Sequence, residues 1–253
     1  MRMYAPNPQA LQALRGSGIE LVLDDVPNRD LQRLAIDAPA AAKWVRDNVL
    51  NYYPDVKFQI IAVRNEVSTA TYSALLSNSY PPSRGSFEGA SRSFMGPIIS
   101  FLRNTNNPLL VNIYPYFAHI NNPHHVPLPY AMFTAPRVVV RDSPFHYKNL
   151  FDAMLDATYS ALEKAGRPKV EIVVSESGWP SAGGPAASVE NAGTYYRNLI
   201  NHVKGRSPKT PGRAIETYLF AMFDENQKIG AQSEKHFGLF SPNKQPKYQL
   251  SFD

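Results

Sequence analysis

The chain contains no cysteine, and this absence excludes three kinds of chemistry. Disulfide bonds, metal sites with cysteine ligands and catalysis by a thiol nucleophile all require that residue. No apolar run is long enough to cross a bilayer, so we expect no membrane association. The chain opens without a secretory signal and has no Asn-x-Ser/Thr acceptor for glycosylation. We therefore expect a cytosolic protein or a mature or shortened form of a secreted one, and the compartment stays open.

A cluster of basic residues is also absent. The net charge is +5 and the isoelectric point is about 9.3, but Lys and Arg are scattered along the chain. A nucleic-acid-binding surface requires clustered positive charge. We therefore expect no nucleic-acid partner, and we interpret the basic balance as a property of the soluble surface.

The sequence does have a regular alternation of strand-like and helix-like segments. Short β-branched runs indicate buried strands, and apolar residues spaced three and four apart indicate helices. No low-complexity linker interrupts the series, so the pattern predicts one α/β domain over 1–253, most economically a (β/α) barrel. The predicted strands are Met1–Tyr4, Ile19–Leu23, Phe58–Val63, Leu109–Ile113, Val170–Val174 and Thr217–Met222, and the predicted helices are Pro8–Leu14, Leu31–Ala35, Pro39–Asn51, Phe94–Leu102, Tyr147–Ala165 and Val189–Val203.

Polar and aromatic side chains follow four of the predicted strands. The carboxyl ends of parallel strands meet on one face of a barrel, so residues far apart in the sequence are expected to converge there. Two carboxylates on opposing strands are the minimal machinery of glycoside hydrolysis, and aromatic rings offer flat apolar faces to sugars. The residues at these strand ends are Asn65 with Glu66, Tyr114 with Phe117, Glu176 with Trp179, and Glu225 with Lys228.

Each of these residues also fits a purely structural role. Glu66 alone is consistent with a helix start or an ion pair, and Trp179 with a core position. The functional interpretation rests on the joint pattern, because every one of these groups follows an apolar strand. The remaining alternatives are packing beneath a loop for Tyr114 and Phe117, a surface ion pair for Glu225 and Lys228, and solvation rather than metal binding for His124 and His125.

The segment from Val173 to Gly184, which contains Ser175-Glu176-Ser177-Gly178-Trp179-Pro180, resembles the signature of glycoside hydrolase family 17 and in particular that of its plant endo-β-1,3-glucanases. Four further blocks resemble family blocks in family order, so the resemblance covers essentially the whole chain. These blocks are Arg2-Met3-Tyr4, the segment 110–117, the segment 221–228 and Phe237-Gly238-Leu239-Phe240.

The resemblance implies a (β/α)₈ barrel that hydrolyses β-1,3-glucan with retention and without a metal or organic cofactor. Glu176 matches the nucleophile and Glu66 matches the general acid/base, and in a retaining enzyme their carboxyl groups lie about 5–5.5 Å apart. Asn65 is placed to hydrogen-bond the sugar 2-hydroxyl. We expect a monomer that binds β-glucan polysaccharide, and the other predicted substrate-binding residues are Tyr4, Tyr114, Phe117, Trp179, Phe223, Glu225 and Lys228.

Three features depart from the family pattern. The chain starts at the block around Tyr4, so we expect the family's first β/α unit to be missing. Glu66 runs directly into Val67-Ser68-Thr69-Ala70, which is similar to the family's fifth strand, although parallel strands need a crossover of a dozen or more residues. We therefore expect an incomplete barrel of six or seven strands with exposed edges. Arg64 stands where the family usually has Gly, and Asp224 where it usually has Asn.

These departures leave alternatives for function. The main hypothesis is an endo-β-1,3-glucanase with two catalytic glutamates. The rival hypothesis is a relative that binds glucan without hydrolysing it, or a truncated product without activity. A third is an enzyme of the same fold that acts on another β-glucan, such as the mixed-linkage polymer.

Overall fold

The computed structural model describes residues 1–24, 34, 37–62, 70–72, 75–87, 90–166 and 169–252, and every structural statement below concerns these residues. They form two compact units, Met1–Thr71 and Tyr72–Asp253, which are described separately. The expectation of a single domain over 1–253 stays a prediction. No helix in the described part of the chain is both long and apolar enough to cross a membrane.

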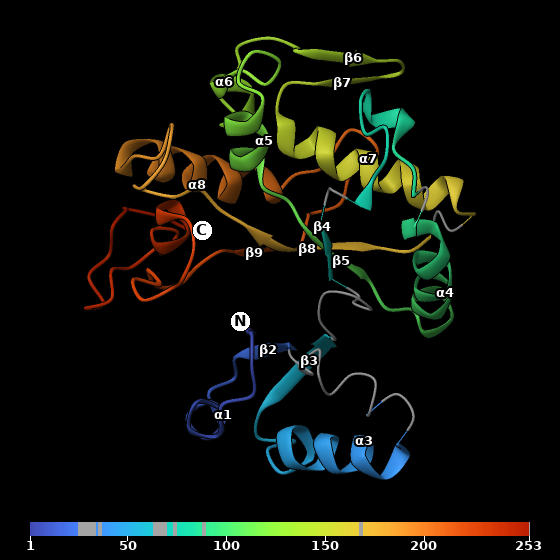
Figure 1. Ribbon diagram of the computed structural model, residues 1–253, viewed down its shortest axis with the longest axis vertical. Coiled ribbons are helices and arrows are strands. Elements are labelled where there is room, and N and C mark those ends of the chain that lie inside the picture. The colour runs from blue at the N-terminus through green and yellow to red at the C-terminus, as the bar shows by residue number, and fades with distance from the viewer. Residues whose placement is uncertain are drawn as a thin grey trace. The chain divides into compact units, whose positions relative to one another are not determined.

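The N-terminal unit is built on a parallel sheet with the strand order β1-β2-β3 (Figure 1). Helices lie between successive strands in the sequence, which is the arrangement that parallel pairing requires. The elements are β1 (Arg2–Met3), α1 (Pro8–Leu14), β2 (Glu20–Asp24), α3 (Ala38–Val45) with the π-helical turn η1 (Arg46–Leu50), and β3 (Lys57–Ala62).

Side-chain caps explain where the two helices of this unit begin. The side chain of Asn7 accepts a hydrogen bond from the backbone N–H of Ala10, and Asp37 does the same for Ala40. Helix α1 buries Leu11 and Leu14, and the turn η1 that continues α3 buries Val49. The core of the unit consists of Leu11, Leu14, Leu21, Leu23, Val49 and Val56.

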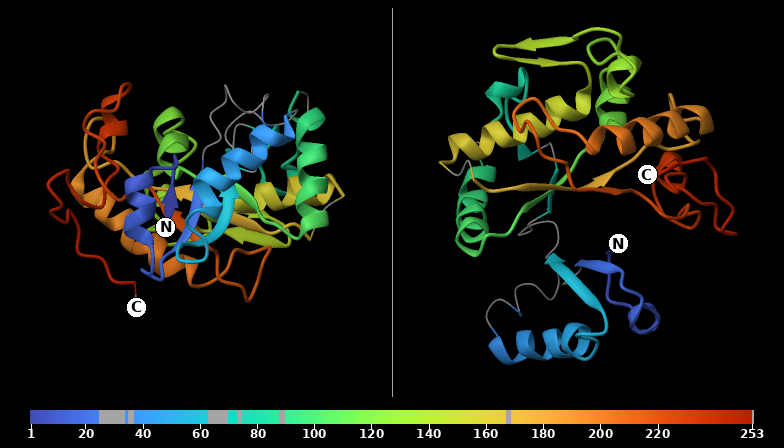
Figure 2. Two further views of the ribbon diagram at one scale, coloured as in Figure 1. Left: turned by 90° about the horizontal axis from the view of Figure 1, so that it is seen from below. Right: turned by 180° about the vertical axis from the view of Figure 1, so that it is seen from behind.

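A second sheet has the strand order β4-β5-β8-β9, in which the parallel neighbours β5, β8 and β9 lie in the C-terminal unit and β4 spans the boundary between the two units. In Figures 1 and 2, helix α7 lies between this sheet and an antiparallel hairpin formed by β6 and β7. The elements are β4 (Ala70–Tyr72), η3 (Pro82–Arg84), α4 (Ala90–Thr105), β5 (Leu109–Asn112), α5 (Pro115–Asn121), α6 (Leu128–Ala131), β6 (Val140–Asp142), β7 (Phe145–Tyr147), α7 (Leu150–Lys164), β8 (Ile172–Ser177), α8 (Val189–Val203), β9 (Thr217–Leu219) and η4 (Gln232–Lys235).

The register of this sheet places the candidate residues at one edge. Asn112, the last residue of β5, is paired with Glu176 after a register shift, and Ser177 is paired with Leu219 of β9. The ends of β5, β8 and β9 therefore meet at the carboxyl edge of the sheet. This is the edge at which parallel α/β folds carry their chemistry.

Most predicted elements are present, with shifted bounds. The helices Pro8–Leu14 and Val189–Val203 are found as predicted, whereas the strand predicted to end at Val174 continues to Ser177 as β8. The sequence did not predict the β6–β7 hairpin. Except for Leu34, the helix predicted over Leu31–Ala35 lies outside the described residues. The two sheets have three and four strands among the described residues, and the expected number of barrel strands stays a prediction.

Candidate active site

Glu176 is the central residue of the candidate site. It is the second-last residue of β8, which is buried over most of its length, and its own side chain is partly exposed. The hydroxyl of Tyr114, the residue that directly precedes α5, donates a hydrogen bond of 2.8 Å to Oε2 of Glu176. The sequence suggested that Tyr114 and Glu176 lie near each other only because each follows an apolar strand. The structure shows that the two side chains are in direct contact. The hydrogen bond fixes the orientation of the carboxylate.

Four aromatic rings form a wall beside this carboxylate, which we call the aromatic wall: Tyr114, Phe117, Phe220 and Phe237. The ring centroid of Tyr114 lies 5.4 Å from that of Phe117, 6.2 Å from that of Phe220 and 5.9 Å from that of Phe237. Tilted and edge-to-face pairs at these separations are favourable. Phe220 and Phe237 are buried, and they hold the partly exposed rings of Tyr114 and Phe117 in place next to the nucleophile candidate. Phe220 and Phe237 were not singled out from the sequence.

Lys228 is held between two carboxylates. Its Nζ lies 3.0 Å from Oε2 of Glu225 and 3.1 Å from Oε2 of Glu234, and 5.1 Å from the ring centroid of Phe220. Burial lowers the pKa of Lys228, but the hydrogen bonds that its ammonium donates to Glu225 and Glu234 outweigh this effect and raise the pKa overall. The ammonium group thus stays charged beside the aromatic wall. Glu234 was missed because it sits on the turn η4 and not at a strand end.

Trp179 occupies the core. Its side chain is fully buried, its Nε1 donates a 2.9 Å hydrogen bond to the carbonyl of Ala186, and its ring lies 5.1 Å from Tyr116 and 5.3 Å from Tyr195. An aromatic platform for sugar must expose a face. Trp179 therefore supports the loop after β8 from beneath, which is the core alternative left open by the sequence.

Gly178 explains why this loop carries a glycine beside the tryptophan. A Cβ atom at this position would lie 2.1 Å from the carbonyl oxygen of Phe220. The chain after β8 and the chain after β9 approach too closely for any side chain. Glycine thus permits the loop with Glu176 to pack against the loop with Phe220.

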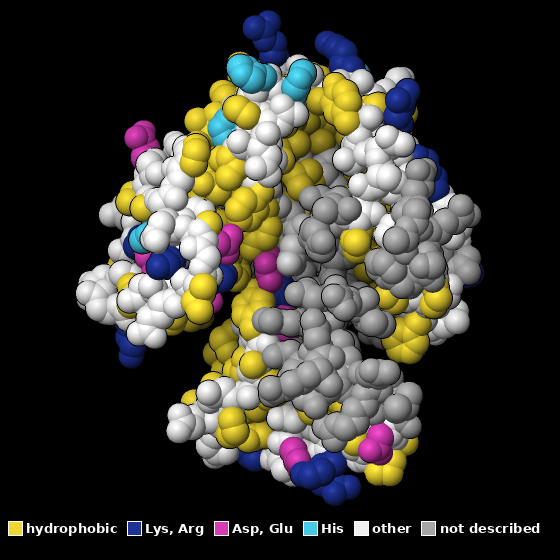
Figure 3. Space-filling model, viewed as in Figure 1, with side chains coloured by type: hydrophobic (Ala, Val, Ile, Leu, Met, Phe, Trp, Pro, Cys, Tyr) yellow, Lys and Arg dark blue, Asp and Glu magenta, His cyan; other side chains and the backbone are white. Residues whose placement is uncertain are grey.

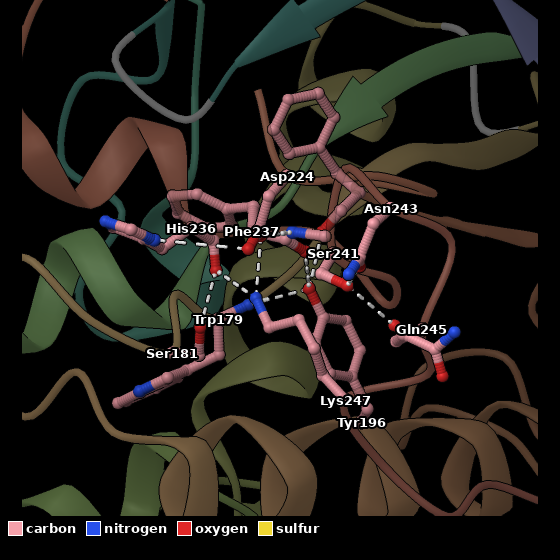
Figure 4. A network of polar contacts seen from close by, with 12 residues as sticks. Trp179, Ser181, Tyr196, Asp224, His236, Phe237, Ser241, Asn243, Gln245 and Lys247 are labelled. Atoms are coloured by element: carbon pink, nitrogen blue, oxygen red, sulfur yellow. Dashed lines mark hydrogen bonds and ion pairs between the residues drawn. The ribbon is translucent and has the colours of Figure 1, made fainter. Parts of the chain in front are cut away.

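A polar network fixes the loop after β9 (Figure 4). Oδ1 of Asp224 accepts hydrogen bonds from the backbone N–H of Gly238 at 2.8 Å and from Nζ of Lys247 at 2.6 Å. Lys247 also donates to the carbonyl of His236, which in addition accepts from the N–H and hydroxyl of Ser181. The network joins the loops after β8 and β9 to the C-terminal segment. It thereby positions the neighbours of Asp224, which include Phe223, whose side chain is 39% exposed, and Glu225.

Several predicted site residues are not placed beside Glu176. Asn65 and Glu66, together with Arg64, lie outside the described residues, so the separation of the Glu66 and Glu176 carboxyl groups stays a prediction. Tyr4 belongs to the N-terminal unit, where the guanidinium of Arg2 lies 4.7 Å from its ring centroid. Within the described part of the chain, no three His, Asp or Glu side chains are placed to hold a metal ion.

A carboxylate at the end of a parallel strand, oriented by a tyrosine and flanked by aromatic rings and a paired lysine, defines a carbohydrate-active hydrolase site on a β/α scaffold. The comparisons with known proteins agree. The family model described as "Glycosyl hydrolases family 17" matches residues 1–77 and 66–252. The chain therefore belongs to glycosyl hydrolases family 17.

Individual relatives give the same result. A glucan endo-1,3-beta-glucosidase of Vitis vinifera is 56% identical over 287 positions that include the whole chain and 83% of the relative. A solved structure from a study of two plant beta-glucan endohydrolases matches with a TM-score of 0.94 and 44% identity. CJP38, a beta-1,3-glucanase and allergen of Cryptomeria japonica pollen, matches with a TM-score of 0.95 and 39% identity. Both structural matches cover the whole chain and 90% of the other protein. The predicted fold class, a (β/α)₈-type barrel, is confirmed.

The alignment with the Vitis vinifera relative also concerns the crossover that the sequence lacks after Glu66. It spans 287 positions, whereas the chain has 253 residues, so at least 34 positions (287 − 253) have no counterpart in this chain. The family model likewise matches in two parts that overlap at residues 66–77. The overlap of the two family matches lies at the segment where the sequence lacks a crossover.

Proposed function

We propose that this protein is an endo-β-1,3-glucanase that cleaves internal bonds of its polysaccharide with retention of configuration. The observation that supports the proposal best is the position of Glu176, at the carboxyl end of β8 and hydrogen-bonded to Tyr114. Glu176 attacks the anomeric carbon and forms a glycosyl ester, while Glu66 protonates the departing oxygen. Glu66 then removes a proton from the water that hydrolyses the ester.

The remaining residues bind and orient the sugar. Tyr114 and Phe117, the two partly exposed members of the aromatic wall, stack against the apolar faces of glucosyl rings, as sugar-binding aromatic residues do. Lys228, held by Glu225 and Glu234, supplies a fixed charged donor for hydroxyl groups. Asn65 and Tyr4 complete the substrate-binding set, and Phe223 extends it along the loop after β9. The partner is a β-glucan chain bound by a monomer, and no nucleic acid takes part.

The proposal is tested by the release of reducing ends from laminarin, a β-1,3-glucan. We expect the unmodified chain to be active and Glu176→Gln to lose at least about a thousandfold in kcat, because the amide is a poor nucleophile. Glu190→Gln, which alters an exposed glutamate at the start of α8, is the matched control and should retain full activity. Full activity in Glu176→Gln would refute the assignment.

Azide distinguishes the two glutamates from each other. In Glu66→Ala a retaining enzyme still forms the glycosyl ester, and azide attacks it to give a β-glycosyl azide. In Glu176→Ala azide replaces the missing nucleophile and gives the α-anomer instead. The opposite pattern would exchange the two roles.

Parallel assays on laminarin and on mixed-linkage glucan measure the linkage preference. Glucan binding without the release of new reducing ends would support the non-hydrolytic alternative.

A further inference from the structure

Strand β8 contains one residue more than its neighbours just before it reaches Glu176. Along β5, Val111 pairs with Val174, but the next residue, Asn112, pairs with Glu176, so that Ser175 is the extra residue. On its other side β8 likewise advances by three residues while β9 advances by two. An extra residue of this kind is a β-bulge, and a bulge changes the direction of the side chains that follow it.

The bulge decides on which face of the sheet Glu176 lies. Paired residues of neighbouring strands share a face, and successive residues alternate between faces. Val111 and Val174 therefore share one face and are buried, whereas Asn112 and Glu176 share the other face and are partly exposed. Figure 3 shows acidic side chains at the surface below α5, beside hydrophobic ones. Without the extra residue, the carboxylate of Glu176 would lie on the buried face of Val174.

The bulged residue is fastened to the neighbouring strand by its side chain. The hydroxyl of Ser175 donates a hydrogen bond of 2.7 Å to Oδ1 of Asn112, and Ser175 is only 1% exposed. One residue further along, the backbone N–H of Ile113 donates a hydrogen bond of 2.9 Å to the carbonyl of Glu176. A side-chain bond and a backbone bond thus tie the bulge to the end of β5.

The side-chain bond between Ser175 and Asn112 is specific to this register. A shift of the pairing by one residue would move Glu176 to the opposite face and would separate the two side chains. The hydrogen bond from Tyr114 orients the carboxylate of Glu176, whereas the bond between Ser175 and Asn112 acts on the backbone that carries it. Both matter for a nucleophile, because a displacement of about 1 Å lowers a reaction rate on the order of a hundredfold.

We propose that Ser175 and Asn112 are positioning residues, whose mutual hydrogen bond holds the bulge of β8 and thereby presents Glu176 to the glucan. The inference rests on the proposed function, in which Glu176 is the nucleophile. Ser177 offers a matched control, because its buried hydroxyl lies 2.6 Å from the hydroxyl of Tyr195 on α8, on the side of β8 that faces away from the site. Replacing either serine by alanine removes a buried hydroxyl from the same strand.

Hydrogen exchange of backbone amides in the whole chain tests the hold on the bulge without any substrate. The Ile113 amide is bound to the bulge, and the Val174 amide, which donates to the carbonyl of Glu216, serves as the reference. Ser175→Ala should raise the exchange rate of Ile113 relative to Val174 roughly fivefold, the equivalent of one hydrogen bond. Ser177→Ala should leave this ratio unchanged. An unchanged ratio in Ser175→Ala, or an equal rise in both variants, would overturn the proposal.

Kinetics on laminarin test the consequence for Glu176. Both serine variants should lose about 3 °C in Tm, since each loses a buried hydrogen bond. Only Ser175→Ala should lower kcat, roughly ten- to hundredfold, with KM changed by less than about twofold. Asn112→Ala should lower kcat at least as much, and combining it with Ser175→Ala should add no further loss, because both remove the same hydrogen bond. Equal kcat values in the two serine variants, or additive losses in the double variant, would overturn the positioning role.

The two proposals fail in different ways. Full activity in Ser175→Ala together with an inactive Glu176→Gln would refute the positioning pair alone. Full activity in Glu176→Gln would refute the proposed function. If the unmodified chain proved inactive, the proposed function would be refuted, and hydrogen exchange would still decide whether Ser175 and Asn112 hold the bulge.

Discussion

At the scale of single residues, Asp156 on α7 is a buried carboxyl group whose ionisation opposes folding. Its side chain is fully buried, and Oδ2 accepts a hydrogen bond of 3.0 Å from the backbone N–H of Lys209. Burial raises the pKa of Asp156 to about 6, although Ser207 and the Lys209 N–H act in the opposite direction. In the unfolded chain an aspartate has a pKa near 3.9. The folded state therefore binds more protons between these two values.

We predict that the free energy of unfolding falls as the pH rises from about 4 to 6, by on the order of 2 kcal/mol from this group. Asp156→Asn should remove this slope and be the more stable protein above pH 6, because its amide oxygen still accepts from Lys209. Urea unfolding at several pH values measures the effect. Glu163→Gln, at an exposed position of the same helix, should keep the slope of the unmodified chain. An unchanged slope in Asp156→Asn would contradict the prediction.

At the scale of elements, the C-terminal segment holds the loop after β9 through backbone hydrogen bonds and through the ion pair of Asp224 with Lys247. The Asp224 and Lys247 side chains are only 12% and 13% exposed, and His236 Nδ1 lies 4.0 Å from the second carboxylate oxygen. Removing one partner of a largely buried pair leaves an uncompensated charge, whereas removing both charges does not. The loop also carries Glu225 and Lys228. The stability of this loop and the activity of the protein are therefore coupled.

We predict that Lys247→Met lowers the free energy of unfolding by about 3 kcal/mol and reduces kcat/KM on laminarin roughly tenfold through displacement of the loop. Asp224→Asn keeps an acceptor for the N–H of Gly238 but leaves the Lys247 ammonium without its counter-charge, so its cost should likewise be about 3 kcal/mol. The double variant should be more stable than Lys247→Met alone, since no charge is left unpaired. Additive losses in thermal unfolding of the four proteins would contradict this coupling.

The helices, strands and loops also show how much of the fold and of the candidate site the sequence could predict. Helix Val189–Val203 was predictable because its apolar residues recur at helical spacing, and Ser188 caps it in the structure. Glu176 and Tyr114 were found because each follows an apolar strand. Glu234 could not be found, because only tertiary packing brings η4 to Lys228. The burial of Trp179 was equally undetermined, since a core tryptophan and a sugar platform leave the same local pattern.

At the scale of the whole molecule, the chain changes sheets without a crossover. β3 ends the sheet β1-β2-β3 at Ala62, and β4 begins the sheet β4-β5-β8-β9 at Ala70. Each of these two strands is therefore an edge strand of its own sheet. Family relatives contain at least 34 additional alignment positions. A crossover helix packed on a sheet would add buried apolar surface.

We predict that inserting the corresponding segment of the Vitis vinifera relative, at the overlap 66–77 of the two family matches, stabilises the protein. Burial by one amphipathic helix should contribute at least about 2 kcal/mol, which corresponds to roughly 5 °C in Tm for a protein of this size. Hydrolysis of laminarin should rise with it, because Glu66 directly precedes the insertion. A Gly/Ser insert of equal length is the control and should raise neither, since it buries no apolar surface. If the two inserts gave the same Tm and the same activity, the absent crossover would not limit this protein.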